Sequence, residues 1–591
     1  MKKLSLKLIL LVFNLLVFSS YSQNSITVTP SDDLQALVDN NAGNTIFQLQ
    51  SGTYRLVTVK PKTNNQFIGV GNVILNGSRL LTNWYKEGNL WVHDGQDQNG
   101  QQHGVCEDDY PNCQKPEDLY LNDVILHHVG SSKADVNESG EWWFDYDNDK
   151  VYMFDDPTGQ KLEINTAKIA FDNRNADYVN IKNLVVEKYA NPPQFGAIGG
   201  QVCGDFWTVE NVESRWNHGV GVMVNNNGIV RNSHFHHNGQ LGITARGKDV
   251  LFENNEVNHN LTAGIDQGWE GGGSKFSLTE NLVVRNNHVH HNFGPGLWTD
   301  IQNTNTLYEN NLVEYNTRMG IFHEISFKAT IKCNTVRYNS NEWSPWLYGS
   351  QILVATSSDV EIFDNKVVVT ATGGNDKGGN GISIIQQDRY GFYGDGDPSI
   401  EDIRYLSKNN YVHDNDITYL GDLGRSGAAT DFDQANFWNN GNNRFENNTY
   451  HVPNPDINRW WWEDYPRSWS NFKAQGNDVT GVVNTDISEA NIVACFDNTQ
   501  LSTEIFKTKT QFLKFNNPVK IGNEINFQTN VATISKLEIF DATGKNLAVI
   551  NSAFTNNKTL TTANLGIYSR GIYFIKVTSN NEYNVQKLIV E

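Results

Sequence analysis

Polar and apolar residues recur in a fixed order through the central part of the chain. Five segments align without gaps: RNSHFHHN at 231–238, ENNEVNHN at 253–260, RNNHVHHN at 285–292, ENNLVEYN at 309–316 and KCNTVRYN at 332–339. Their starting points are 22, 32, 24 and 23 residues apart. A period in the low twenties with asparagine in fixed columns and no heptad is typical of a right-handed parallel β-helix, in which each repeat forms one coil.

The order within each segment assigns its residues to the two sides of a strand, because side chains alternate along a strand. The inward column is predicted to be Phe235, Val257, Val289, Val313 and Val336. The asparagine column, Asn238, Asn260, Asn292, Asn316 and Asn339, is expected at a turn, where stacked amides bond one another and tolerate left-handed backbone. The column before it, His237, His259, His291, Tyr315 and Tyr338, favours a packing ladder over a metal site.

A second strand of each coil opens with glycine. It is read in GVMVN at 221–225, GITAR at 242–246, GIDQG at 264–268, GLWTD at 296–300 and GIFHE at 320–324. The residue after the glycine is apolar and is predicted to point inward. The outward positions then hold Met223, Thr244, Arg246, Asp266, Trp298, Asp300, Phe322 and Glu324. Since neighbouring coils lie ~4.8 Å apart, Asp300 and Glu324 should be stacked neighbours.

Several segments interrupt or flank the repeats. The 32-residue interval carries extra residues, WEGGGSKFSLTE at 269–280, which are expected to leave the stack as a loop. Residues 31–40 are predicted to form a helix with Ser31 as its N-cap, covering the open end of the stack. Residues 85–160 alternate as short strands between turn residues and predict an inserted β-subdomain. Clustered aromatic residues at 460–476 can close the last coil.

The two ends of the chain differ from the repeats. Residues 1–22 place three lysines ahead of a short apolar run, the pattern of a signal peptide. That run is too short to span a membrane, and no later segment supplies a span, so the mature protein is expected to leave the cytoplasm. The β-helix is predicted to occupy residues 25–485, followed by a linker at 486–508. From 509 to 591 short strands without the asparagine columns predict a small β-sandwich. The fold class is therefore all-β.

Charge and cysteine content narrow the classes of function. The chain has 46 Lys and Arg against 66 Asp and Glu, a net charge of -20, which argues against a nucleic-acid-binding protein. Cys106 and Cys113 are close enough for a small disulfide loop, and the sequence leaves open whether they are bridged. Cys203, Cys333 and Cys495 are scattered and lack metal-ligand spacing.

Two parts of the chain resemble known families. The segments FNNPV at 515–519, LEIFDATGK, GIYFIKV and the terminal KLIV resemble the C-terminal sorting domain of type IX secretion in Gram-negative bacteria. This resemblance implies export across the outer membrane by the type IX machinery, to the cell surface or the medium, with loss or anchoring of the domain. A carbohydrate-binding sandwich is the alternative interpretation of this domain.

The central segments, among them IAFDNRNADYVNIKNLVVEKYANPPQFGAI, WEGGGSKF, GPGLWTDI and MGIFHEIS, resemble secreted β-helix proteins of the pectate-lyase-like superfamily. The resemblance covers roughly residues 25–485 and implies the fold. It does not fix the reaction, because the same scaffold carries polysaccharide lyases, glycoside hydrolases, epimerases and inert adhesins. The paired-aspartate pattern of galacturonase-like hydrolases is not visible in this chain.

The expected partner is a polysaccharide or oligosaccharide. Between Arg215 and Arg337 the chain has ten Lys and Arg and ten Asp and Glu, so these coils are neutral within an acidic protein. This distribution suits an anionic ligand. A lyase acting on uronic-acid-containing polymers by β-elimination is therefore the first hypothesis, a paired-carboxylate glycoside hydrolase the second, and a non-catalytic carbohydrate-binding adhesin the third. The protein is expected to be a monomer.

Candidate site residues follow from these hypotheses. A lyase needs a base and a cation that neutralises the uronate, for which Lys275, Arg318 and His323 are candidates, with Arg246 and Lys328 as further cations. A hydrolase needs two carboxylates, for which Asp300 and Glu324 are the natural pair. Trp269 and Trp298 can form platforms for a sugar ring. Asp266, Asp300 and Glu324 could together hold Ca²⁺ as an optional cofactor. His323 could instead be a core histidine, because its position faces inward.

Overall fold

The computed structural model has two units, residues 1–496 and residues 497–591. In the first unit the structure describes residues 24–340, 346–371, 379–389 and 405–487. In the second it describes residues 513–515, 519–529, 536–541, 546–550, 558–562, 565, 571–579 and 582–590. The predicted signal peptide at 1–22, almost all of the predicted linker at 486–508, and Cys495 lie outside the described residues.

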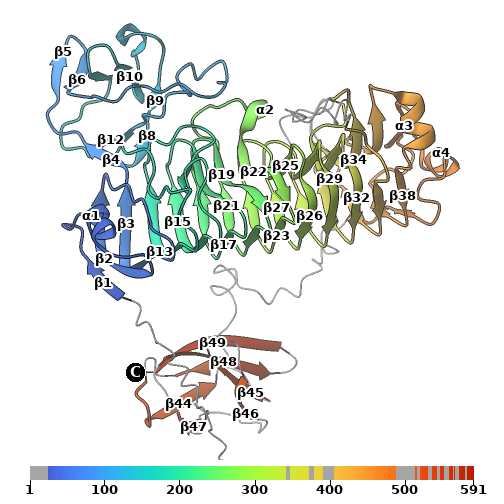
Figure 1. The fold of residues 1–591 in the computed structure, drawn as a ribbon. Coiled ribbons are helices and arrows are strands. Elements are labelled where there is room, and N and C mark those ends of the chain that lie inside the picture. The colour runs from blue at the N-terminus through green and yellow to red at the C-terminus, as the bar shows by residue number, and fades with distance from the viewer. Residues whose placement is uncertain are drawn as a thin grey trace, which may run out of the picture. The chain divides into compact units, whose positions relative to one another are not determined.

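The first unit is a right-handed parallel β-helix, as predicted, and its coils lie side by side from one end of the stack to the other (Figure 1). The stack begins with β1 (Asn24–Val28), β2 (Thr45–Arg55), β3 (Gln66–Asn76), β13 (Asn180–Glu187) and β15 (Thr208–Arg215). From β15 onward each coil contributes three short strands, and each strand pairs in parallel with its counterpart in the next coil. The stack therefore has three faces, which we call the first, second and third face.

The strands of the three faces are as follows. The first face contains β14 (Gly196–Ile198), β16 (Val220–Val224), β19 (Leu241–Lys248), β22 (Gly272–Glu280), β25 (Leu297–Asp300), β28 (Ile321–Glu324), β31 (Ser350–Ala355), β34 (Asn380–Gln386), β37 (Ser426–Thr430) and β40 (Trp460–Trp462). The second face contains β17 (Ile229–Arg231), β20 (Leu251–Glu253), β23 (Val283–Arg285), β26 (Thr304–Glu309), β29 (Phe327–Lys332), β32 (Ser358–Phe363), β35 (Tyr411–His413) and β38 (Arg444–Glu446). The third face contains β18 (His234–His236), β21 (Glu256–Asn258), β24 (His288–His290), β27 (Leu312–Glu314), β30 (Thr335–Arg337), β33 (Lys366–Val369), β36 (Asp416–Tyr419), β39 (Thr449–His451) and β42 (Val482–Asn484).

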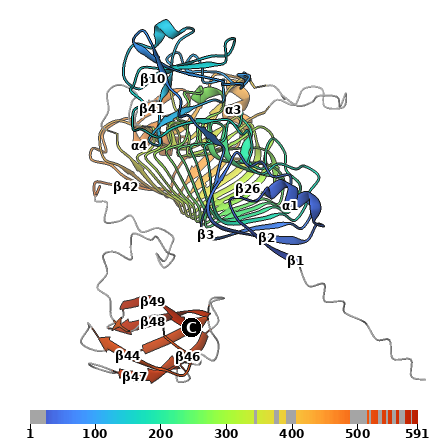
Figure 2. The ribbon, with the colours of Figure 1, turned by 90° about the vertical axis from the view of Figure 1, so that its left-hand side faces the viewer.

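The space inside the coils is filled by the predicted apolar column. Phe235 and its counterparts Val257, Val289, Val313 and Val336 are fully buried in one continuous core that runs the length of the stack. Figure 2 views the stack from the end that carries β1. Burial of one such side chain in each coil contributes about 1.5–3 kcal/mol, and the stacking of coils joins these contributions into one core.

A ladder of buried asparagine side chains joins the coils at one corner. Each Nδ2 donates to the Oδ1 of the next residue, from Asn238 to Asn260 at 3.0 Å, from Asn260 to Asn292 at 2.9 Å, from Asn292 to Asn316 at 2.8 Å and from Asn316 to Asn339 at 2.9 Å. Each amide also donates to a backbone carbonyl of the preceding coil, as Asn292 does to Val257 at 3.1 Å. The buried amides are thereby satisfied only when successive coils are in register.

At this corner the left-handed backbone conformation is adopted by the histidines that precede the asparagines, and not by the asparagines themselves. His237, His259 and His291 have φ values of 52°, 51° and 52°. Their rings stack from coil to coil at centroid distances of 5.0 Å and 5.3 Å. The packing ladder is therefore confirmed, but the expected left-handed asparagines are wrong, because the positive φ one residue earlier turns each asparagine side chain into the core.

Both ends of the stack are covered. Helix α1 (Leu34–Asn40) buries Leu34 and Val38 at the first coil. Its N-cap is Asp33, whose side chain accepts a hydrogen bond from the Ala36 N–H, so the predicted Ser31 cap is wrong. At the other end β41 (Tyr465–Arg467) forms an antiparallel hairpin with β40, and α4 (Trp469–Ala474) packs against it. A further helix, α3 (Gln434–Asn440), lies in the same region.

An inserted β-subdomain leaves the stack between β3 and β13 and spans slightly more than the expected 85–160. One sheet joins β5 (Tyr85–Glu87), β6 (Leu90–Asp94), β11 (Lys150–Met153), β10 (Glu141–Asp145) and β9 (His127–His128). A second joins β4 (Ser78–Leu80), β12 (Leu162–Asn165), β7 (Leu119–Leu121) and β8 (Val124–Ile125), and a short 3₁₀ helix spans Lys133–Asp135. The subdomain has its own apolar core around Trp142.

The second unit is a small β-sandwich of two antiparallel sheets, as predicted. One sheet contains β43 (Leu513–Lys514), β44 (Glu524–Thr529) and β47 (Lys558–Thr561). The other contains β46 (Asn546–Ile550), β45 (Lys536–Asp541), β48 (Gly571–Ser579) and β49 (Glu582–Val590). Its core, which includes Ile525, Phe527 and Ile575, is separate from that of the β-helix.

The asparagine ladder gives a first testable prediction. We expect Asn292→Ala to lower the free energy of unfolding by at least about 3 kcal/mol, because it leaves several buried donors and acceptors without partners at about 1–3 kcal/mol each. Urea unfolding monitored by tryptophan fluorescence measures the change. Asn175→Ala, at an exposed position, is the control and should cost less than about 0.5 kcal/mol. Equal stability of the two variants would contradict the role assigned to the ladder.

Candidate active site

The register of the first face differs from the predicted one in the coil with the insertion. The segment GGSKF at 272–276 occupies the strand position, since Ile243 pairs with Ser274 and Thr244 with Lys275. The segment GIDQG therefore lies outside the strand, and the extra residues that leave the stack precede Gly272. The rule of an apolar residue after glycine was misleading here, because the inward position holds Ser274, whose hydroxyl donates to the Gly296 carbonyl at 3.2 Å.

This register brings charged side chains of three adjacent strands and two connecting segments together on the outside of the first face. Asp300 pairs with Glu324 across adjacent strands, which confirms their predicted stacking. The Lys275 ammonium lies 2.8 Å from Asp300 Oδ2 and 3.9 Å from Glu270 Oε1. The Arg389 guanidinium lies 2.8 Å from Glu324 Oε1. The two neighbouring carboxylates are thus each held by their own cation, and we call these five residues the charged cluster.

Burial decides the protonation of this cluster. The side chains of Lys275, Asp300 and Glu324 are only 7%, 7% and 9% exposed. Burial, together with the charge of Asp300, raises the pKa of Glu324 to about 7 although Arg389 opposes the shift. Burial also acts to lower the pKa of Lys275, but the charges of Glu270 and Asp300 outweigh it and raise that pKa. Near neutral pH Glu324 can therefore donate a proton, whereas Lys275 holds its own.

An apolar cluster adjoins the charged cluster on the same face. Trp298 stacks on Phe322 with ring centroids 5.5 Å apart, and the Lys275 ammonium lies 4.2 Å from the Trp298 ring centroid. Trp298 is only 4% exposed, so in this structure its ring faces are covered by protein. Its indole N–H and Asp300 Oδ1 are buried without a hydrogen-bond partner among the described residues. These two groups are a donor and an acceptor that a ligand or water can use.

Of the remaining candidates, Trp269 touches the charged cluster, since its backbone carbonyl accepts a hydrogen bond from the Lys275 ammonium at 3.3 Å. Asp266 is the N-cap of α2 (Gln267–Glu270), and its carboxylate acts electrostatically on Arg318. Trp269, in the same short helix, meets His103 of the inserted subdomain edge-on at 5.7 Å. Arg246 is exposed beside a β-bulge in β19, and Lys328 lies in β29 on the second face.

The predicted set of calcium ligands is not assembled. Among the described residues, Asp266, Asp300 and Glu324 do not form a group whose ligand atoms all lie within 4.8 Å of one another. The physical reason is the shifted register, which moves Asp266 off the strand. In addition, Lys275 and Arg389 already neutralise the other two carboxylates, and a divalent cation would have to displace them. The donor set thus does not fit Ca²⁺.

His323 is a core residue. It lies inside the coil with 0% exposure, and its Nδ1 is 2.7 Å from Thr299 Oγ1. Burial lowers the pKa of His323 to about 3. A ring that faces the interior cannot reach a ligand on the outside of the coil, so the prediction of His323 as a catalytic base is wrong and the alternative of a core histidine is confirmed.

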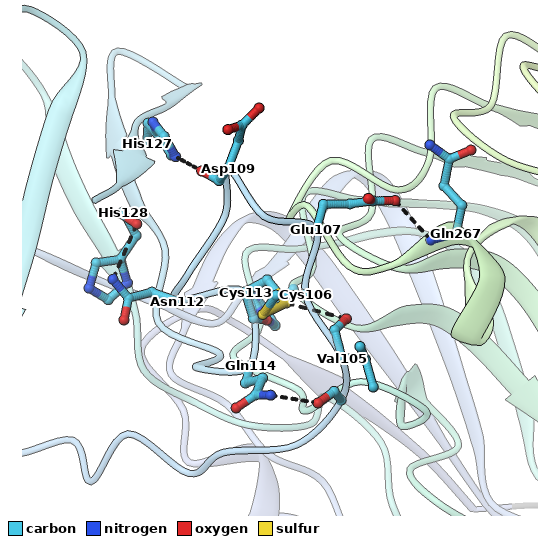
Figure 3. The surroundings of a disulfide bond; sticks show 12 residues. Val105, Cys106, Glu107, Asp109, Asn112, Cys113, Gln114, His127, His128 and Gln267 are labelled. Atoms are coloured by element: carbon cyan, nitrogen blue, oxygen red, sulfur yellow. Dashed lines mark hydrogen bonds between the residues drawn. A yellow bond between two sulfur atoms is a disulfide. The ribbon is translucent and has the colours of Figure 1, made fainter. Parts of the chain in front are cut away.

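The inserted subdomain reaches this part of the β-helix through a disulfide loop (Figure 3). Cys106 and Cys113 are bridged, with Cα atoms 5.6 Å apart. Cys106 forms a β-bridge with Ile265, and the Gln267 N–H donates to Glu107 Oε1 at 3.2 Å. The loop therefore fixes the segment before Gly272 and, with it, Glu270 of the charged cluster.

A cavity of about 280 Å³ lies behind the disulfide loop, between the subdomain and the coils. Its polar lining includes Lys115, Asp118, His128 and His218. His218 is buried and bonds Asp118 at 3.1 Å and the Cys113 carbonyl at 2.9 Å, which joins the two parts of the unit. These contacts hold the subdomain on the β-helix.

Sequence reasoning missed Glu270 and Arg389. Glu270 was within the segment read as a loop, and its place in the cluster depends on how α2 docks. Arg389 is 65 residues from its partner Glu324 and belongs to no aligned repeat, so no spacing signal could have connected the two.

Two family models match the chain. The model of the right-handed β-helix region matches residues 197–367, which contain the whole charged cluster except Arg389. The model of the secretion system C-terminal sorting domain matches residues 515–591. The chain is a right-handed β-helix with a secretion sorting domain. Both predicted resemblances are confirmed at this level, and the sorting domain indicates secretion to the cell surface or beyond it.

Comparison with solved structures supports the fold of the β-helix unit. A structure described as XylC in complex with xylose has a TM-score of 0.54 at 14% identity, covering 95% of this chain and 100% of that one. The A-module of the mannuronan C-5 epimerase AlgE4 of Azotobacter vinelandii has a TM-score of 0.39 at 14% identity, covering 76% of this chain and 92% of that one. At 14% identity the likeness to the XylC structure shows the fold alone. No curated protein matches the sequence.

Within the described residues, no helix has the length and apolar character needed to cross a membrane.

The raised pKa of Glu324 gives a second prediction. The folded protein binds this proton more tightly than the unfolded chain, whose glutamates titrate near 4.5. The stabilisation is therefore complete below about pH 4.5 and is lost as pH rises through about 7. Glu324→Gln carries no such proton, so its melting temperature relative to the wild type should rise between pH 5 and pH 8.

Scanning calorimetry at several pH values measures this difference. Glu138→Gln, at an exposed position, is the matched control and should follow the wild type at every pH. A constant difference between Glu324→Gln and the wild type across this range would contradict the pKa assigned to Glu324.

The sorting domain gives a third prediction. A chain that ends at Phe496 should unfold at the same temperature as the first unit of the full chain, because the two units have separate cores. In the producing bacterium this truncated chain should fail to reach the surface or the medium, which fractionation and immunoblotting would detect. Normal export of the truncated chain would contradict the assigned role.

Proposed function

We propose that this protein is a secreted carbohydrate-active enzyme and that the charged cluster is its catalytic site. The fold, the secretion sorting domain and the adjacent buried carboxylates support this proposal together. The observation that carries it is the Asp300–Glu324 pair, in which one carboxyl has its pKa raised to about 7 and the other is paired with an ammonium ion. Two carboxyl groups with different environments are what an acid and a nucleophile need at one site.

The arrangement supports glycoside hydrolysis best. Neighbouring strands lie ~4.8 Å apart, close to the ~5–5.5 Å between the carboxyl groups of retaining glycosidases. In this mechanism Glu324 donates its proton to the glycosidic oxygen while Asp300 attacks the anomeric carbon. Water, deprotonated by Glu324, then releases the sugar and restores both groups. Asp300 Oδ1, which has no hydrogen-bond partner in the part of the chain that the structure describes, is the oxygen that the Lys275 ammonium leaves for the attack.

The hypothesis of a lyase becomes the second candidate. Of its proposed bases, His323 faces the interior and Lys275 has a raised pKa, so neither is suited to take a proton. Arg318 interacts electrostatically with Asp266 and Glu107. What still favours a lyase is the pair of cations, Lys275 and Arg389, which could neutralise the carboxylate of a uronic acid.

The products distinguish the two reactions, and this is the fourth prediction. The purified protein is incubated with a panel of neutral and uronate-containing polysaccharides. A hydrolase releases reducing ends without ultraviolet absorbance, whereas a lyase adds an unsaturated uronate that absorbs in the ultraviolet. We expect reducing ends alone, and Glu324→Gln should lower the rate by about 10²–10⁴-fold.

Three variants test the roles of the carboxylates. Glu324→Gln keeps the shape of the protonated side chain and should remain folded. Asp300→Asn leaves the Lys275 ammonium buried without its partner, so its melting temperature must be measured beside its activity. Asp300→Gly with added azide should recover activity and yield a glycosyl azide if Asp300 is the nucleophile. Full activity of folded Glu324→Gln on every substrate that the wild type cleaves would contradict the proposal.

A further inference from the structure

The outward side of the third face carries a second group of titratable side chains, independent of the charged cluster. In three successive coils His234 pairs with Glu256, and Glu256 with His288. Two residues further along the same strands, Asn258 pairs with His290. Glu256 therefore has an imidazole in the next coil directly opposite and another on the diagonal.

Three of these groups are close enough to share one ion. One ligand atom from each of Glu256, His288 and His290 lies within 4.8 Å of the others. The Glu256 Oε1 to His290 Nε2 distance is 3.2 Å. In a tetrahedral site with bonds of ~2.0–2.1 Å, two ligand atoms are ~3.3 Å apart, so this pair already has the separation of two zinc ligands.

Hydrogen bonds outside the group support metal-binding orientations of both rings. His290 Nδ1 is 2.8 Å from His291 Nδ1, and His288 Nε2 is 3.0 Å from Glu314 Oε1. A histidine that binds a metal through one nitrogen usually donates its other N–H to a carboxylate or another acceptor. His291 can accept from His290 when its own ring is neutral, and Glu314 adds a carboxylate beside His288.

The neighbours of Glu256 distinguish this position from similar pairs on the same face. The hydrogen-bond partners that the structure shows for Glu256 are His290 and Asn258, neither of which is Lys or Arg. By contrast, Glu213, which bonds His236 at 3.1 Å, is also paired with Arg215. Of the two carboxylates, Glu213 is held by an arginine, whereas the described residues place no arginine on Glu256.

We propose that Glu256, His288 and His290 bind a divalent transition-metal ion such as Zn²⁺, with Glu314 and His291 orienting the two rings. Two imidazoles and one carboxylate are a common donor set for zinc, and the fourth position remains open to water or a ligand. The ligands come from β21 and β24, so a bound ion would join adjacent coils and raise the stability of the stack.

The experiment is a calorimetric titration of the full chain, without a histidine tag, with ZnCl₂. We expect about one Zn²⁺ per chain and a rise in melting temperature on binding. His290→Gln and Glu256→Gln should each weaken binding by at least tenfold. His236→Gln is the matched control, since it removes the corresponding ring beside a carboxylate that Arg215 already holds, and it should bind as the wild type does.

Substitution of Co²⁺ for Zn²⁺ gives a second measurement, because its visible absorption reports nitrogen ligation directly. That absorption should be present in the wild type and in His236→Gln and absent in His290→Gln. Circular dichroism checks that each variant is folded, and Glu256→Gln replaces His290→Gln if the latter is not. Binding that is absent in the wild type, or unchanged in the folded His288→Gln/His290→Gln variant, would overturn the proposal.

Discussion

The interaction on which the structure depends is the hydrogen bond that one buried asparagine amide donates to the next along the stack. An amide inside the protein loses its water and must find partners there. The amide of Asn260 accepts from Asn238 at 3.0 Å and donates to Asn292 at 2.9 Å, and Asn292 in turn donates to Asn316 at 2.8 Å. A slip by one residue would exchange the inner and outer side chains of the strand, and it would also leave these amides unsatisfied. The asparagine ladder therefore fixes the register between successive coils more strictly than the apolar core would do alone.

A fixed register inside the coils also fixes which side chains meet outside them. Thr299 and His323 point inward and are paired across adjacent strands. The outward residues that follow them, Asp300 and Glu324, are therefore neighbours too. Two carboxyl groups held at strand spacing and removed from water cannot both ionise easily. The raised pKa of Glu324, to about 7, is thus a consequence of the stacking that stabilises the fold. The third face shows the same effect with opposite sign, since His290 lowers the pKa of Glu256 to about 2.

The insertions complete what the repeats begin. The disulfide loop of the inserted subdomain holds the segment at Ile265 and Gln267, and this segment carries Glu270 toward Lys275. Arg389, from a later coil, neutralises Glu324 from the other side. The repeating strands thus place Lys275, Asp300 and Glu324 in one row. The non-repeating segments supply Glu270 and Arg389, whose opposite charges make it possible to bury that row. Chemistry in this fold depends on both.

The β-helix, the asparagine and histidine ladders, the pairing of Asp300 with Glu324 and the separate sorting domain could all be predicted from the sequence. These features are repeated or local, so each coil predicts the next and the pattern is visible along the chain. Three features became visible only in the folded chain: Asp266 leaves the strand, Lys275 takes a place in it, and Arg389 pairs with Glu324. Ser274 is a polar residue at an inward position, so the sequence pattern gives no sign that its segment forms the strand; its hydroxyl is satisfied there by the Gly296 carbonyl. The contact between Arg389 and Glu324 joins residues 65 positions apart and depends on how a connecting segment folds back onto the stack.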